Sequence, residues 1–132
     1  MSRQTLFWLI MLLFTALIPL FMIFFGAVFA NSEPKKINES FGYRTRRSMK
    51  NLDTWTFAHH YLGRLWLRIG LIVLIPTVIA GMFAFGKDAD TIGMRAVITE
   101  GLQLIPMVIS IIMTERALKK NFDKDGKRLS EE

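Results

Sequence analysis

The chain has 132 residues, of which 52% are hydrophobic and 21% are charged, and it carries a formal net charge of +6. It contains no cysteine, which excludes a small disulfide-stabilised scaffold. The apolar residues are gathered into long runs, whereas a soluble domain of this size distributes them periodically. This clustering predicts a membrane protein that forms one domain over residues 1–132.

Three apolar runs are each long enough to cross a bilayer, which requires about 20 residues. Residues 4–32 and residues 69–86 contain no charged side chain. Residues 96–114 contain one charge, Glu100, and the amide of Gln103. Because lipid offers no hydrogen-bond partners, each run is expected to be helical. The sequence therefore predicts an all-α integral membrane protein with three transmembrane helices, at about residues 5–30, 62–86 and 92–114.

The first run also has features of a secretory signal peptide. It follows Arg3, and Val28-Phe29-Ala30 matches the small-residue pattern of a cleavage site. The apolar core of a signal peptide has only about 7 to 15 residues, and this run is far longer. We therefore expect a retained membrane anchor and not a cleaved leader.

Lysine and arginine are distributed unequally between the two sides of the predicted membrane. Twelve of the 17 lie in the connecting loop, residues 31–61, and in the tail, residues 115–132. Short loops rich in these residues stay in the cytoplasm. This predicts an outward-facing N-terminus and a cytoplasmic C-terminus, with the connecting loop meeting anionic lipid headgroups.

The loop leads into the second span through an amphipathic segment. Asn51 is expected to cap a helix that begins at Leu52, lies at the membrane interface and continues into the span. Before it, four cations alternate with hydroxyl side chains, a composition suited to anionic groups, although the positive-inside rule alone also accounts for it. The cations are Arg44, Arg46, Arg47 and Lys50.

A spaced set of residues in this region resembles the signature of the SdpI/YfhL family of small bacterial membrane proteins. The set comprises Asn38, Gly42-Tyr43-Arg44-Thr45, Ser48, Trp55, His59 and Gly63. The resemblance covers the loop and most of the second and third spans. It implies a multi-pass protein of the bacterial cytoplasmic membrane. The family's best-known member confers immunity to a secreted membrane-active killing peptide and is described as holding a cytoplasmic repressor at the membrane.

The resemblance leads to three functional hypotheses. The first is immunity to a toxic peptide, with the motif residues binding the toxin, a lipid phosphate or a partner. In that hypothesis Arg44 anchors a carboxylate, carbonyl or phosphate, and Trp55 packs beside it at the interface. The second is a membrane tether or sensor that recruits a cytoplasmic transcriptional regulator. The third is a lipid-binding accessory subunit of a larger membrane complex.

Glu100 and Gln103 form a possible polar site inside the membrane. Glu100 lies about 6 Å beyond Ala96 along the predicted helix, and carboxylates at such positions are usually functional. Alternatively, the helix begins later and leaves Glu100 near the headgroups beside Arg95. Gln103 shares the face of Glu100 and is placed to hydrogen-bond across helices.

Other functional classes are not expected. The sequence has no paired catalytic carboxylates beside a base and no phosphate-binding glycine loop, so it predicts no enzyme and no cofactor. His59 and His60 are adjacent and point about 100° apart on a helix, which disfavours a metal site. Direct nucleic-acid binding is not expected from basic residues tied to membrane helices. The tail from residue 121 has calcium-loop-like spacing, but its interleaved lysines predict a solvated, frayed end instead.

Overall fold

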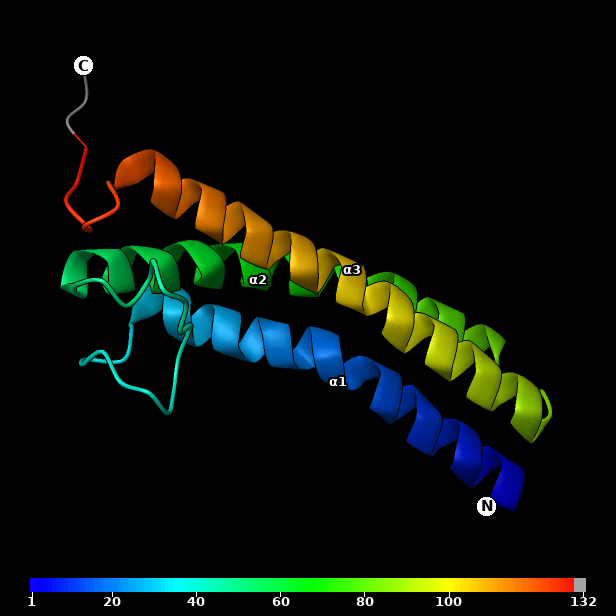
Figure 1. Cartoon of the computed structure of the whole chain (residues 1–132). Helices are drawn as coiled ribbons and strands as arrows, with labels where there is room; N and C mark the ends of the chain where they lie inside the picture. Colours follow the sequence, from blue (N-terminus) through cyan, green and yellow to red (C-terminus); the bar gives the residue numbers. More distant parts are fainter. Residues whose placement is uncertain (130–132) are drawn as a thin grey trace.

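In the computed structural model, which describes residues 1–129, three long helices lie side by side in an elongated bundle (Figure 1). They are α1 (Arg3–Asn31), α2 (Leu52–Phe83) and α3 (Ala89–Asn121). All three are long and apolar enough to cross a membrane, and no strand occurs among the described residues. The predicted all-helical class, with three helices long and apolar enough to span a membrane, is thus confirmed for the described residues.

Local sequence signals account for the helix boundaries. The Ser2 hydroxyl accepts a hydrogen bond from the Thr5 N–H and caps α1. Asn51 caps α2 with a reciprocal pair of hydrogen bonds to Thr54, so α2 begins at Leu52 as predicted and runs unbroken into its apolar part. α1 and α3 extend past the predicted spans at both ends, because residues flanking the apolar core continue its backbone hydrogen bonding. α2 instead ends at Phe83, three residues before the predicted end of the second span at residue 86.

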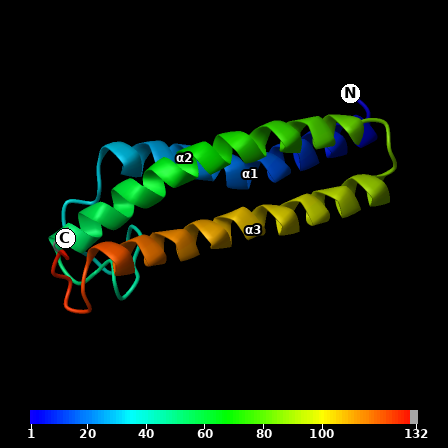
Figure 2. The ribbon, with the colours of Figure 1, turned by 90° about the horizontal axis from the view of Figure 1, so that it is seen from above.

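The first two helices make the most extensive contact in the bundle, and α3 contacts each of them less. Figure 2 shows α3 lying apart from the closely paired α1 and α2. A buried small residue recurs at every seventh position along α2 and its C-cap: Gly63, Gly70, Thr77 and the capping residue Ala84. Small side chains allow two backbones to approach closely, which is the usual means of packing helices in lipid.

The closest approach is between Gly26 of α1 and Gly63 of α2. A Cβ atom added at Gly63 would overlap the backbone nitrogen of Ala30 and lie 2.9 Å from the Gly26 carbonyl oxygen. A Cβ atom added at Gly26 would lie 2.5 Å from the backbone nitrogen of Leu67. Backbone atoms cannot rotate away as side chains do, so only glycine fits at this crossing.

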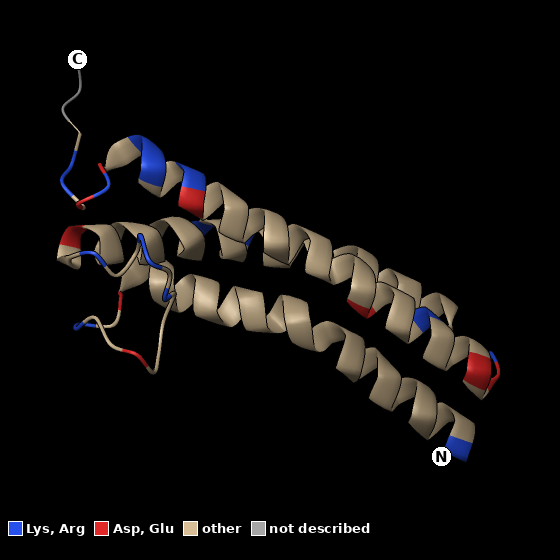
Figure 3. Cartoon of the chain, viewed as in Figure 1, with Lys and Arg blue, Asp and Glu red and all other residues tan. Residues whose placement is uncertain are grey.

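The two ends of the bundle differ in charge (Figure 3). One end holds the loop of residues 32–51, here called the basic loop, together with the C-terminal residues, and we call it the basic end. The other end holds the N-terminus and the short turn between α2 and α3. The two groups of cations that the sequence places on the same side of the membrane therefore lie at the same end of the fold.

The residues after α3 form a short hairpin instead of the frayed end expected from the sequence. Phe122 pairs with Arg128 in an isolated β-bridge, and Gly126 turns the chain with a φ of 85°. The Asn51 side-chain amide donates to the Gly126 carbonyl at 2.6 Å. The cap of α2 therefore also anchors residues 122–129, here called the C-terminal hairpin; residues 130–132 lie outside the described part of the chain.

Candidate functional site

The family-like motif residues fold the basic loop against the start of α2. The Asn38 side-chain oxygen accepts hydrogen bonds from the backbone N–H groups of Ser40 and Phe41, at 2.9 and 2.6 Å. Gly42 has a φ of 110°, and a Cβ atom there would lie 2.6 Å from His59 Nε2. Glycine is thus required at this position both by the backbone angle and by the close contact.

His59 joins the loop to α2 with both ring nitrogens. Its Nδ1 lies 2.8 Å from the Trp55 carbonyl oxygen, and its Nε2 accepts the backbone N–H of Tyr43 at 2.8 Å. A carbonyl only accepts hydrogen bonds, so Nδ1 carries the proton and the ring is neutral. The side chain is fully buried, and this arrangement leaves it no free nitrogen for a metal.

Tyr43 links the loop to the end of α3. Its hydroxyl donates to Glu115 Oε1 at 2.6 Å. Burial, together with this hydrogen bond, raises the pKa of the Tyr43 hydroxyl above its ordinary value of 10.0. The hydroxyl therefore stays protonated and acts as a donor, which holds the loop against α3.

Thr45 and Ser48 close the second turn of the loop. The Ser48 hydroxyl accepts the Thr45 backbone N–H at 2.9 Å, and the Thr45 hydroxyl accepts the Ser48 N–H at 3.2 Å. Ser48 is fully buried, and its carbonyl accepts the Thr54 hydroxyl at 3.0 Å. These short polar side chains replace the regular backbone bonds that a loop lacks.

Trp55 and Arg44 occupy different environments. Trp55 is fully buried, its indole N–H donates to the Pro34 carbonyl at 2.7 Å, and its ring packs on His59. Arg44 is exposed, and its guanidinium donates to the Glu39 carbonyl within the same loop. Trp55 therefore belongs to the core of the folded loop, whereas Arg44 lies at its surface.

A hollow of about 610 Å³ opens between the basic loop and the C-terminal hairpin, and we call it the basic hollow. Four cations and two carboxylates line it, so its net charge is positive. Its residues are Thr45, Arg46, Arg47, Lys50, Glu115, Lys124 and Asp125.

The predicted intramembrane polar pair lies on α3. Gln103 is buried, and its amide donates to the Thr15 carbonyl of α1 and the Thr77 hydroxyl of α2, each at 2.9 Å. The expectation that Gln103 hydrogen-bonds across helices is therefore confirmed. One oxygen of Glu100 and the side-chain oxygen of Gln103 are buried without a partner among the described residues.

The later start of the third helix, considered as an alternative, is wrong, because α3 begins at Ala89. Glu100 therefore lies about 16 Å along the helix from its first residue. The depth of Glu100 in the membrane stays a prediction. The turn at Gly86 ends before Asp88, and this acidic residue at the helix N-terminus is favoured by the helix dipole, which explains the early start.

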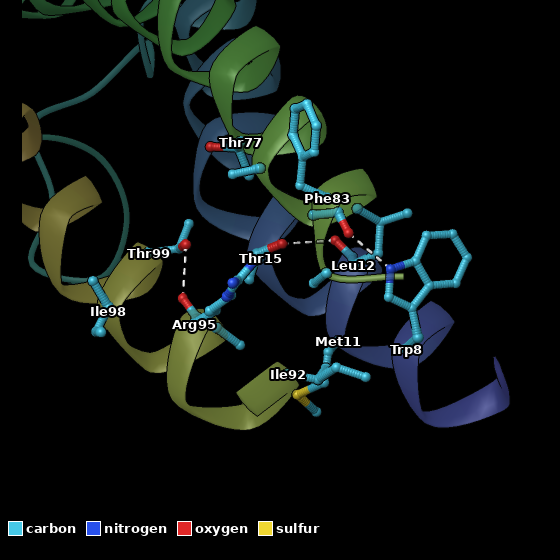
Figure 4. A pocket seen from close by; sticks show the side chains of 14 residues that line it. Trp8, Met11, Leu12, Thr15, Thr77, Phe83, Ile92, Arg95, Ile98 and Thr99 are labelled. Atoms are coloured by element: carbon cyan, nitrogen blue, oxygen red, sulfur yellow. Dashed lines mark hydrogen bonds between the residues drawn. The ribbon is translucent and has the colours of Figure 1, made fainter. Parts of the chain in front are cut away.

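A cavity of about 320 Å³ lies between the three helices at the end opposite the basic end, and we call it the three-helix cavity (Figure 4). Its walls are mainly apolar, with Arg95 and a few threonine hydroxyls among them. Trp8 closes one side, and its indole N–H donates to the Gly81 carbonyl at 2.7 Å. An apolar groove of about 350 Å³ between α2 and α3 adjoins it through Thr77, Ala80 and Thr99, and is bordered by Gln103.

A family model described as the SdpI/YfhL protein family matches residues 35–114, which include the whole motif. The chain belongs to the SdpI/YfhL family. The chain is 36% identical over 99 residues to the uncharacterized protein YfhL of Bacillus subtilis (strain 168). The match covers 74% of this chain and 79% of that protein. No solved structure matches the chain. The SdpI/YfhL match ends before Glu115, so the C-terminal hairpin lies outside it.

Sequence reasoning missed the small-residue face of α2 and the role of Gly26. The seven-residue recurrence from Gly63 to Ala84 was a visible signal, since small residues at helical spacing are typical of membrane helix contacts. It also missed the C-terminal hairpin and the basic hollow. Here the signal was weak, because the pairing of Asn51 with Gly126 joins residues far apart in the chain.

Proposed function

We propose that this SdpI/YfhL protein gives its host resistance to a toxic membrane-active peptide. The observation that carries the proposal is the three-helix cavity, which adjoins a groove bordered by a buried amide oxygen without a partner. The family resemblance supports the same function. In this proposal the protein holds part of the peptide between its helices and so keeps it from disrupting the bilayer.

The chemistry of the cavity and groove suits an apolar peptide with a few polar groups. Aromatic and aliphatic walls accept apolar side chains, and van der Waals packing against them stabilises the complex, since lipid itself provides no hydrophobic driving force. The side-chain oxygen of Gln103 is buried and has no partner among the described residues, so a hydroxyl, amide or amine of a peptide that displaced the side chains covering it would find an acceptor there. In lipid such a donor has no water to satisfy it, so the pairing favours binding.

The proposed test is survival of a sensitive bacterial host challenged with membrane-active killing peptides. Ala80→Phe fills the junction of the cavity and the groove, and Ile79→Phe is the matched control because Ile79 is exposed and lines neither. We expect protection by the wild type and by Ile79→Phe, and its loss in Ala80→Phe at equal membrane levels. Equal protection by both variants would contradict binding at this place.

Arg44→Ala in the same assay tests the motif loop. Because the Arg44 side chain is exposed and bonded only within its own loop, its removal is expected to leave the fold intact. Loss of protection in Arg44→Ala with Ala80→Phe still protective would move the peptide site to the basic loop. Failure of the wild type to protect against any peptide would refute the proposed function.

A second candidate function is the recruitment of a cytoplasmic regulator. It is favoured by the gathering of twelve lysines and arginines in the basic loop and tail, which offers one positively charged face to a soluble protein. The test is in-cell crosslinking from a photoreactive group placed in the basic loop. The control carries the same group at the N-terminus, at the other end of the bundle. Recovery of no soluble protein from the loop would contradict this function.

A further inference from the structure

We propose that the basic hollow is a binding site for a phosphate group. The hollow is separate from the three-helix cavity, and this inference does not depend on the proposed function. Its cations come from two distant segments: Arg46, Arg47 and Lys50 from the basic loop, and Lys124 from the C-terminal hairpin. Phosphate groups are recognised by such convergent guanidinium and ammonium donors.

The four cations are not neutralised by neighbouring side chains. Within residues 1–129 the ion pair at hydrogen-bond distance joins His60 and Glu33, and none of the hollow's cations takes part in one. The hollow also holds two carboxylates, so its cations are in excess by two positive charges. One carboxylate, that of Glu115, is already engaged, because its Oε1 accepts a hydrogen bond from the Tyr43 hydroxyl. An anion entering the hollow therefore meets unpaired donors.

Both walls of the hollow are held in place before any ligand binds. The loop wall is fixed by the hydrogen bonds between Thr45 and Ser48. The hairpin wall is fixed by Asn51, which donates to the Gly126 carbonyl, and by Asp123, whose Oδ1 accepts two backbone N–H groups at 2.9 Å. Less ordering is then required on binding, which increases affinity for a small anion.

The position of the hollow suits a phosphate at a membrane surface. Glu115 directly follows the apolar run of α3 that ends at Thr114, so the hollow opens where the apolar part of the bundle ends. A phospholipid headgroup and a free phosphate ion both carry the required chemistry. Since the hairpin wall lies outside the region matched by the family model, the site is completed by the part of the chain beyond that region.

The test compares two double variants with the same loss of charge. Arg47→Gln/Lys124→Gln removes one cation from each wall, whereas Lys35→Gln/Lys36→Gln removes two exposed cations of the same loop that do not line the hollow. Detergent-purified protein is measured by native mass spectrometry with phosphatidylglycerol or phosphatidylcholine. In a second arm, its thermal unfolding is followed during titration with inorganic phosphate. Circular dichroism checks that each variant folds.

We expect wild type and the Lys35/Lys36 variant to retain phosphatidylglycerol, and the Arg47/Lys124 variant to bind it at least about tenfold more weakly. That result supports a lipid headgroup as ligand. Stabilisation by inorganic phosphate with the same dependence on the variants supports a free phosphate. Equal binding by the two double variants, or no binding of either probe to the wild type, would overturn the proposal.

Discussion

The helix crossing at Gly63 allows a quantitative prediction. In Gly63→Ala the new methyl group would lie 2.6 Å from the Phe29 carbonyl carbon and 2.9 Å from the Gly26 oxygen, and it would overlap the Ala30 nitrogen. All three are backbone atoms, so no rotamer change relieves the overlap. The two helices must instead move apart by about 1 Å along their most extensive contact to restore ordinary van der Waals distances.

Overpacking of this kind costs about 1–3 kcal/mol, and the backbone contacts here place the cost near the upper value. Alanine is also a better helix former than glycine by about 1 kcal/mol, which offsets part of the loss. Gly101→Ala is the matched control, because its methyl group would meet nothing within 4 Å on the exposed face of α3. The propensity gain is common to both variants, so their free energies of unfolding should differ by about 3 kcal/mol.

The assay is reversible unfolding in mixed micelles with an increasing fraction of denaturing detergent, followed by tryptophan fluorescence and circular dichroism. Gly63→Ala should unfold at a lower detergent fraction than the wild type, and Gly101→Ala at an equal or higher fraction. If the two variants unfold together, the close approach of α1 and α2 does not contribute to stability and the reasoning is refuted.

Three further predictions concern the basic end. Trp55→Phe removes the indole donor to the partly buried Pro34 carbonyl and should lower the unfolding free energy by about 1–3 kcal/mol in the same assay, whereas an unchanged value would contradict its role in the loop core. Asn51→Asp keeps the capping oxygen but loses the donor to Gly126, so hydrogen exchange should rise in the C-terminal hairpin only, while Asn51→Ala should also weaken α2 by about 1 kcal/mol. The hydrogen bond with His60 lowers the pKa of the Glu33 carboxyl below its ordinary value of 4.5. The stability that the ionised Glu33 contributes is therefore fully present above pH 4.5 and is lost as the pH falls through the lowered pKa. An NMR titration should show the Glu33 pKa rising in His60→Ala, and an unchanged pKa would exclude the interaction.

The motif residues show how far sequence reasoning reaches toward a site. Their types and spacing identified the family, yet their roles needed the fold. His59 is bonded on both nitrogens, and Gly42 and Gly63 are required by contacts with other segments. That these residues bind a toxin, lipid or partner stays a prediction. The contacts of the buried motif residues account for their residue types through folding alone, whereas the exposed Arg44 is not explained in this way.

The sequence by itself determined the three helices, the capped start of α2 at Asn51 and the gathering of cations at one end. These follow from local rules: apolar run length, hydrogen bonding within a helix, and side-chain capping within three residues. Only the tertiary structure decided that Gln103 joins α1 and α2, that Gly26 meets Gly63, and that the C-terminal hairpin completes the basic hollow. Each of these contacts joins residues far apart in the chain, and helix packing, which depends on all three surfaces together, selects among the many pairings that local patterns allow.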